Sequence, residues 1–172
     1  MTMTMTSAHP DNQISRNKLV LSLSVLLLTL AVAGFVAWHQ RTFARAEVVI
    51  DGRIKVAADV ASTPMTREKG LSGRESLGPD EGVLFIFVRA DRYAFWMEDM
   101  KFPIDILWIK GDEIVDITTD VPTPAAGAPL ERYFPMYAVD KVLEVPAGFA
   151  ARNGLRTGLK LEINIDKVTD GR

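Results

Sequence analysis

The chain has 172 residues, with 20 Lys or Arg against 22 Asp or Glu, so its formal net charge is −2. This mildly acidic balance, without a basic cluster in its C-terminal part, argues against nucleic acid as a partner. Cysteine is absent and the only histidines are His9 and His39, so a domain that begins after residue 46 excludes disulfides, thiol nucleophiles, Ser-His-Asp triads and His- or Cys-based metal sites.

The N-terminal region predicts a membrane anchor. Residues 1–18 are polar and partly repetitive, which is typical of a disordered tail. Residues 19–38 contain no charged side chain, and a helix of that length, about 30 Å, matches the hydrocarbon core of a bilayer. We therefore predict one transmembrane helix, followed by a juxtamembrane linker over residues 39–46.

A cleaved signal peptide is the alternative for this region. Residues 44–46 read Ala-Arg-Ala, a small-x-small cleavage pattern, and cleavage after Ala46 would give a secreted protein. The uncharged run is longer than the usual signal core of about 7 to 15 residues, which favours the anchor. Basic residues flank both ends of the run and do not set its orientation. Because a long C-terminal domain can translocate largely regardless of charge, we expect a single-pass protein of the cell membrane with an extracytoplasmic domain.

Residues 47–168 predict one mainly β domain. Two stretches carry helix signals: the first is capped by Ser62 or Thr63 and ended by Gly70 or Gly73, and the second ends at Gly154. Alternation and turn residues indicate strands over residues 46–51, 54–61, 83–88, 92–98, 102–109, 114–121, 137–145 and 159–165. The proline-rich residues 122–135 predict a loop. These elements predict a compact barrel-like or sandwich domain with two short helices.

Five blocks of this domain resemble one family. They are "STPMTREKGLSGRESL", "DEGVLFIF", "RYAFWMEDMKFPIDILWI", "YAVDKVLEVPAGFA" and "NGLRTG", in the family's order, over about residues 54–163. The family is DUF192, an uncharacterised domain family. The resemblance implies a compact, barrel-like β domain that is often exported or tethered by one N-terminal helix, and it implies no definite activity. The chain departs from the family at Leu159, where Asp is frequent, and in the 122–135 loop, which lacks the cysteines of some members.

The segment from Arg92 to Ile109 holds most of the candidate binding residues. Phe95, Trp96 and Met97 are consecutive bulky side chains. They either belong to the core, as aromatic residues at strand spacing usually do, or line a ligand groove beside the 122–135 loop. If Trp96 is buried, its indole N–H needs a polar partner.

Asp105 is the only charged residue between Lys101 and Lys110. A carboxylate on an apolar strand must be hydrogen-bonded or ion-paired, or its pKa rises. We expect Asp105 to be buried, ionised and paired with Arg74, whose guanidinium can satisfy both carboxylate oxygens. Arg74 and the adjacent Glu75 are also candidates for direct contact with a ligand.

Two functions fit these residues. The first is a non-catalytic module that binds an unknown envelope ligand or protein. The second is a carboxylate-dependent hydrolase or lyase that acts on a cell-envelope polymer, with Asp105 paired with Glu75 or Glu98. We favour the first because the domain lacks the usual catalytic side chains, and we assign no catalytic residue. An Asp-rich calcium loop is also missing, so we expect neither a metal nor a cofactor.

Overall fold

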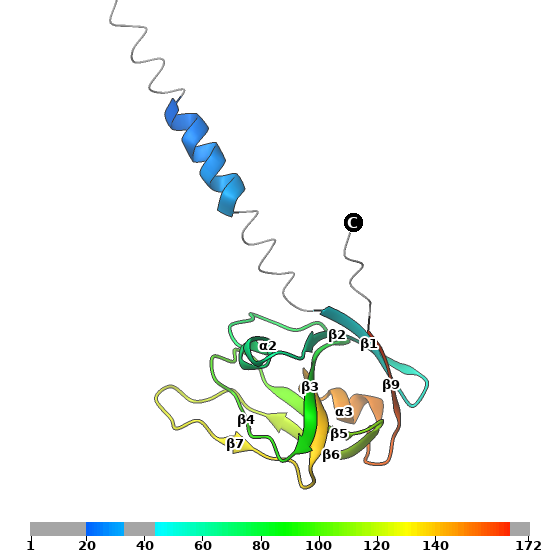
Figure 1. Ribbon diagram of the computed structural model, residues 1–172. Helices are drawn as coiled ribbons and strands as arrows, with labels where there is room; N and C mark the ends of the chain where they lie inside the picture. Colours follow the sequence, from blue (N-terminus) through cyan, green and yellow to red (C-terminus); the bar gives the residue numbers. More distant parts are fainter. Residues whose placement is uncertain (1–19, 33–43, 166–172) are drawn as a thin grey trace, which may run out of the picture. The chain divides into compact units, whose positions relative to one another are not determined.

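The computed structural model describes residues 20–32 and 44–165 and divides the chain into two units, Met1–Thr42 and Phe43–Arg172 (Figure 1). In the first unit, residues 20–32 form a helix in which Ser24 and Thr29 donate hydrogen bonds to carbonyl groups about one turn earlier. None of the helices in the described ranges is long and apolar enough to cross a membrane. The predicted tail lies outside the described residues, as do parts of the predicted 19–38 span and of the linker.

The second unit is mainly β with two short helices, as the sequence predicts. Its elements are β1 (Ala44–Ile50), β2 (Ile54–Ala61), α2 (Pro64–Lys69), β3 (Glu81–Asp91), β4 (Phe95–Trp96), β5 (Ile104–Lys110), β6 (Glu113–Val121), β7 (Arg132–Tyr133), β8 (Val139–Pro146), α3 (Phe149–Asn153) and β9 (Leu161–Ile165). The predicted strand over residues 92–98 is much shorter than expected, because this segment leaves the large sheet and pairs only with β7.

Seven strands form one sheet in the order β6-β5-β8-β3-β2-β1-β9, and β4 and β7 lie side by side in a separate two-stranded sheet (Figure 1). Neighbours in the large sheet are antiparallel except for β2 and β3, whose parallel pairing is allowed by the crossover that contains α2. The two sheet edges meet at an isolated bridge between Glu113 and Lys160. The sheet is not a closed barrel, because β6 and β9 share no continuous ladder.

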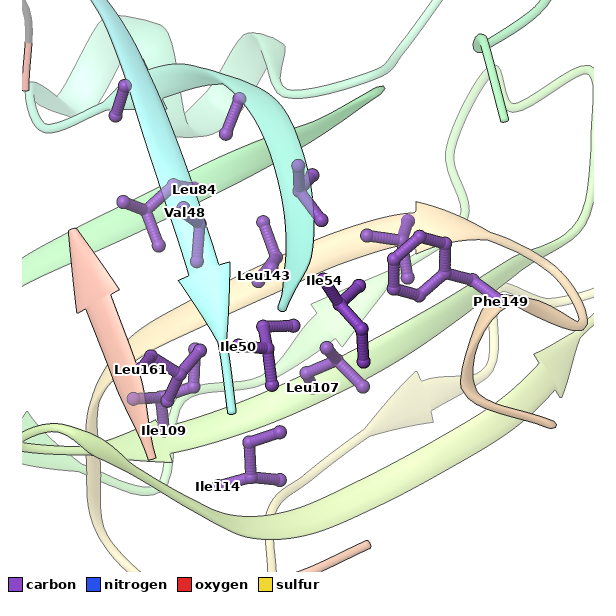
Figure 2. Packing of buried hydrophobic residues seen from close by; sticks show 14 of the residues in the cluster. Val48, Ile50, Ile54, Leu84, Leu107, Ile109, Ile114, Leu143, Phe149 and Leu161 are labelled. Carbon is purple, nitrogen blue, oxygen red and sulfur yellow. The ribbon is translucent and has the colours of Figure 1, made fainter. Parts of the chain in front are cut away.

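Apolar side chains pack on both faces of the large sheet. One cluster joins the inner faces of β1, β2, β5 and β8 to α3 (Figure 2), and it includes Val48, Ile50, Leu107, Leu143 and Phe149. The opposite face packs against the loop after α2 and against β4, with Val83, Phe85, Ile106, Trp108, Val142, Leu71 and Phe95. Strand β5 contributes to both clusters. A carboxyl group on β5 or on its neighbour β8 is therefore surrounded by apolar side chains whichever face it occupies.

Candidate ligand-binding site

A cavity of about 370 Å³ lies between α2, the loop that follows it, and residues of β3 and β4. Its volume falls within the usual range of small-molecule sites, about 300 to 1,000 Å³. Most of the wall is apolar, and its larger apolar and aromatic side chains are Leu71, Phe85, Phe87, Tyr93, Phe95, Trp96 and Met100. Its charged lining residues are Arg67, Glu68, Lys69 and Glu144, and Ser72 and Tyr93 bear hydroxyl groups.

Helix α2 borders the cavity because both of its ends are fixed. Thr63 accepts a hydrogen bond from the Thr66 amide, and the Thr66 hydroxyl accepts one from the Thr63 amide at 3.0 Å, so the two residues form a reciprocal cap. At the other end, Gly70 has a φ of 42°, and a Cβ atom there would lie 3.0 Å from the Phe85 ring. Glycine therefore allows the end of α2 to pack directly against the cavity wall.

Ring contacts hold the aromatic wall in place. Phe85 and Phe95 meet edge to face with their centroids 4.9 Å apart, and Phe95 meets Trp108 in the same way at 5.4 Å. Phe87 stacks on Tyr93 at 3.7 Å. Such pairs each contribute about 0.5 to 1.5 kcal/mol beyond the burial of their area, so the wall is preformed.

Trp96 forms the exposed rim of this cavity. It pairs with Arg132 of β7 and keeps 47% of its surface exposed. Its indole N–H donates a hydrogen bond to Glu98 at 3.2 Å, which supplies a polar partner of the expected kind. Phe95 is buried but still lines the cavity, whereas Met97 is buried in the core and lies outside the lining. The groove interpretation therefore applies to Phe95 and Trp96, and the core interpretation applies to Met97.

Glu144 is the polar group on the sheet side of the cavity. It lies on β8 between Val83 of β3 and Ile106 of β5, and only 6% of its surface is exposed. Within the described ranges no group donates a hydrogen bond to its carboxyl oxygens, which are not sealed from solvent and reach the cavity. Burial raises the pKa of Glu144 to about 8, although the positive charge of Arg74 opposes this rise.

This raised pKa links proton binding to stability. The carboxyl group titrates near 4.5 when it is unperturbed and near 8 in the folded protein. Between these values the folded chain binds more protons than the unfolded chain, so Glu144 makes the free energy of unfolding fall as the pH rises, by at most about 1.4 kcal/mol per pH unit. A buried carboxyl group that is held in a cavity at this cost is a functional candidate.

Asp105 is fully buried, as predicted, but its partners are backbone amides. One carboxylate oxygen accepts hydrogen bonds from the amides of Asp120 at 2.8 Å and Gly148 at 3.3 Å, and the other accepts one from Ala150 at 2.8 Å. Three donors therefore replace the water that the carboxylate loses on folding. We therefore interpret the group as structural, and it does not line the cavity.

Two backbone irregularities supply these amides. The β5–β6 pairing shifts register between Ile104 and Ile106, and Asp120, opposite this shift, has a φ of 53°. The N-cap residue of helix α3 is Gly148, whose φ is 76° and which offers no side-chain hydrogen bond to the helix. The first amides of a helix lack partners within it, so Asp105 caps α3 from the neighbouring strand.

The predicted ion pair between Asp105 and Arg74 is therefore wrong. Arg74 instead binds the carboxylate of Asp59 on β2 at 2.7 Å. The prediction preferred a cation over the alternative of hydrogen bonds alone, whereas the backbone provides three donors for Asp105. Arg74 still bears on the site, since its charge lowers the pKa of Glu144.

The other candidates are dispersed. Glu75 is exposed and ion-paired with Lys101, and Glu98 is an exposed partner of Trp96. Asp105 is fully buried and hydrogen-bonded to backbone amides, whereas both glutamates are exposed. In the described part of the chain, no group of three acidic or histidine side chains is placed to hold a metal ion.

Glu144 is not among the residues predicted from the sequence, although its sequence pattern is informative. Glu144 is the only charged residue between Lys141 and Arg152, which is the same pattern that drew attention to Asp105. Applied to β8, that reasoning would have identified a second buried acid.

The family model DUF192, described as an uncharacterized ACR, matches residues 46–163. The chain belongs to the DUF192 family. All residues that line the cavity lie within the matched part of this DUF192 domain.

Two solved structures resemble the DUF192 domain. One, from Sinorhizobium meliloti 1021, is provisionally described as a transcription regulator; it is 29% identical, has a TM-score of 0.63, and the match covers 70% of this chain and 94% of that chain. The other is a protein of unknown function from Novosphingobium aromaticivorans DSM 12444; it is 28% identical, has a TM-score of 0.61, and the match covers 70% and 84% of the two chains. The search of curated proteins found no match.

Replacing Asp105 tests its structural role. We expect Asp105→Ala to lower the free energy of unfolding by about 3 kcal/mol or more, because it leaves several amides without an acceptor. Asp105→Asn should lose less, since it keeps one acceptor oxygen. Denaturant unfolding measures both, with Asp112→Ala as the control, because Asp112 is an exposed acid whose surface ion pair contributes little to stability. Wild-type stability in Asp105→Ala would contradict the assignment.

Proposed function

We propose that this DUF192 protein is a membrane-anchored, non-catalytic binding module that holds a small ligand in the cavity between α2, β3 and β4. The observation that carries the proposal is an aromatic wall combined with one buried carboxyl group, Glu144, that has no hydrogen-bond donor in the described structure. Small-molecule sites have this composition, because an apolar wall excludes water and a few polar groups orient the ligand.

The charged residues of α2 differ in their availability to a ligand. Arg67 donates hydrogen bonds to the carbonyl groups of Ser62 at 2.6 Å and Ile86 at 3.2 Å, so it acts as part of the wall. Glu68 and Lys69 are exposed. Of the charged residues that line the cavity, Glu144 is thus the buried one, so a contact with it is shielded from water.

Catalysis is the second candidate. A carboxyl group with a pKa of about 8 suits a general acid near neutral pH. A glycosidase-like reaction requires two carboxyl groups on either side of the cleaved bond, about 5 to 10 Å apart, and the other carboxylate that lines the cavity is the exposed Glu68. A hydrolase or lyase acting on an envelope polymer is therefore less well supported than binding.

We base the proposed anchor on the uncharged residues 19–38. We also propose that the domain lies on the extracytoplasmic side. The position of β1 supports an uncleaved chain. Ala46 is buried, and it pairs with Ala58 of β2 and Ile165 of β9. Cleavage after Ala46 would remove the first three residues of β1 together with these contacts.

Filling the cavity tests the binding function. Ala94 lines the cavity, so we expect Ala94→Phe to weaken the binding of small aromatic and aliphatic fragments by about tenfold or more, about 1.4 kcal/mol. Saturation-transfer NMR on the full-length protein in neutral detergent measures the dissociation constants. Ala90→Phe is the matched control, because Ala90 is exposed and does not line the cavity. If neither the wild type nor the control binds any fragment, or if Ala94→Phe binds as well as they do, the cavity is not the binding site.

Membrane fractionation tests the anchor. We expect the full-length chain to remain in the membrane after alkaline carbonate extraction, because this treatment breaks electrostatic contacts and a spanning helix is held by apolar contact with the bilayer. We also expect protease added from outside to digest the domain. N-terminal sequencing tests the alternative of cleavage. A mature chain that begins at Glu47 would show that residues 44–46 form a cleavage site and would contradict the anchor.

A further inference from the structure

The groups that face the cavity indicate the chemistry of its ligand. Carboxylates accept hydrogen bonds from N–H donors, and aromatic faces attract cations. We propose that the cavity binds a compact organic cation, a protonated amine on an apolar group, with its ammonium against Glu144 and its apolar part against Phe85 and Trp96. This inference rests on the proposed binding function and names the ligand class for the same cavity.

Glu144 lacks hydrogen-bond donors, which a protonated amine supplies. The two buried acids differ in this respect: Asp105 accepts three backbone hydrogen bonds, whereas Glu144 accepts none within the described ranges. A primary ammonium group carries three N–H donors and a positive charge. It would satisfy the carboxylate and offset the cost of keeping an unpaired charge away from water.

The protein's own cations near Glu144 are already engaged. Arg74, in the loop after α2, acts on Glu144 but is ion-paired with Asp59. On α2, Arg67 is bound to backbone carbonyl groups. Arg74 and Arg67 therefore do not need Glu144 as a partner.

The remaining groups around Glu144 also leave a place for a cation. On α2, the exposed Glu68 and Lys69 carry opposite charges and offset each other at the edge of the cavity. On the flanking strands, the residues paired with Glu144 are the apolar Val83 and Ile106. Tyr93 also lines the cavity, and its hydroxyl donates a hydrogen bond to the Arg89 carbonyl at 2.7 Å. The two strand positions paired with Glu144 therefore bring no positive charge to it.

The aromatic wall distinguishes a cation from a neutral ligand. A neutral hydrogen-bond acceptor would bind the protonated form of Glu144, and it would gain only apolar contact from the rings. A cation gains electrostatic attraction to the faces of Trp, Tyr and Phe as well. The two ligand classes also differ in what happens to the proton of Glu144. A cation binds the ionised carboxylate, so the proton is released to solvent, whereas a neutral acceptor leaves the proton on the carboxyl group.

Two probes of equal size separate these classes. We expect benzylamine to bind the full-length protein in neutral detergent more tightly than benzyl alcohol does at pH 8. Below pH 8, its affinity should fall about tenfold for each unit of pH, because the ionised fraction of Glu144 falls in that proportion. Isothermal titration calorimetry in buffers of different ionisation enthalpy should show about one proton released per benzylamine bound at pH 6.5, and none per benzyl alcohol.

Glu144→Gln should abolish the preference for benzylamine and its pH dependence, whereas Glu68→Gln, which changes an exposed lining residue, should keep both. Circular dichroism shows whether each variant is folded. Benzyl alcohol binding that equals or exceeds benzylamine binding overturns the cation assignment while leaving the cavity as a binding site. If fragments bind in the Ala94 experiment and benzylamine does not, the cation assignment fails and the proposed function stands. If no probe binds the folded protein, both fail.

Discussion

The carboxylate of Asp105 fixes the junction on which the rest of the domain depends. It joins β5, the bulge of β6 and the first turn of α3 through hydrogen bonds to three amides that have no partner within their own elements. Because α3 follows β8 directly, this contact also sets where β8 ends. In the β5–β8 pairing, Asp105 lies opposite Val145, and Glu144 lies opposite Ile106. The position of the cavity carboxyl group thus follows from the register that Asp105 holds.

Asp105 and Glu144 occupy neighbouring strands but opposite faces of the sheet. Successive side chains of a strand alternate between faces, so Asp105 shares a face with Leu107 and Leu143, and Glu144 shares one with Ile106. On the first face, the ends of β6 and α3 provide backbone donors. On the second, α2 and β4 provide aromatic rings and an opening. The same side-chain chemistry therefore gives a structural cap on one face and a candidate binding group on the other.

Most of the fold could be predicted from the sequence. Alternation and turn residues indicate most of the strands, and Thr63, Pro64 and Gly154 lie at the ends of helices as their capping preferences predict. The short length of β4 and its pairing with β7 could not be predicted, because β7 lies within a proline-rich segment that resembles a loop. The family was also recognisable from five ordered blocks and is confirmed by the match over residues 46–163.

The candidate site was harder to predict, for a physical reason. Sequence pattern shows that a buried acid needs a partner, but it does not show whether backbone amides will supply it. The amides that bind Asp105 depend on a bulge and a glycine at positive φ, which involve residues distant in sequence. Phe95 and Trp96 could be identified because their residue types are read directly from the sequence. The cavity that they line could not, because it depends on the packing of α2 against Phe85.

The central claim is that Glu144 remains largely protonated at neutral pH on the wall of an open cavity. The most direct measurement is an NMR titration of the side-chain carboxyl groups in protein labelled with ¹³C-glutamate, with Glu144→Gln to assign the resonance. We expect the Glu144 carbon to shift with a midpoint near pH 8. A midpoint near the ordinary value of 4.5 would show that the carboxylate is already satisfied by the protein or by water, and it would contradict the account of the site.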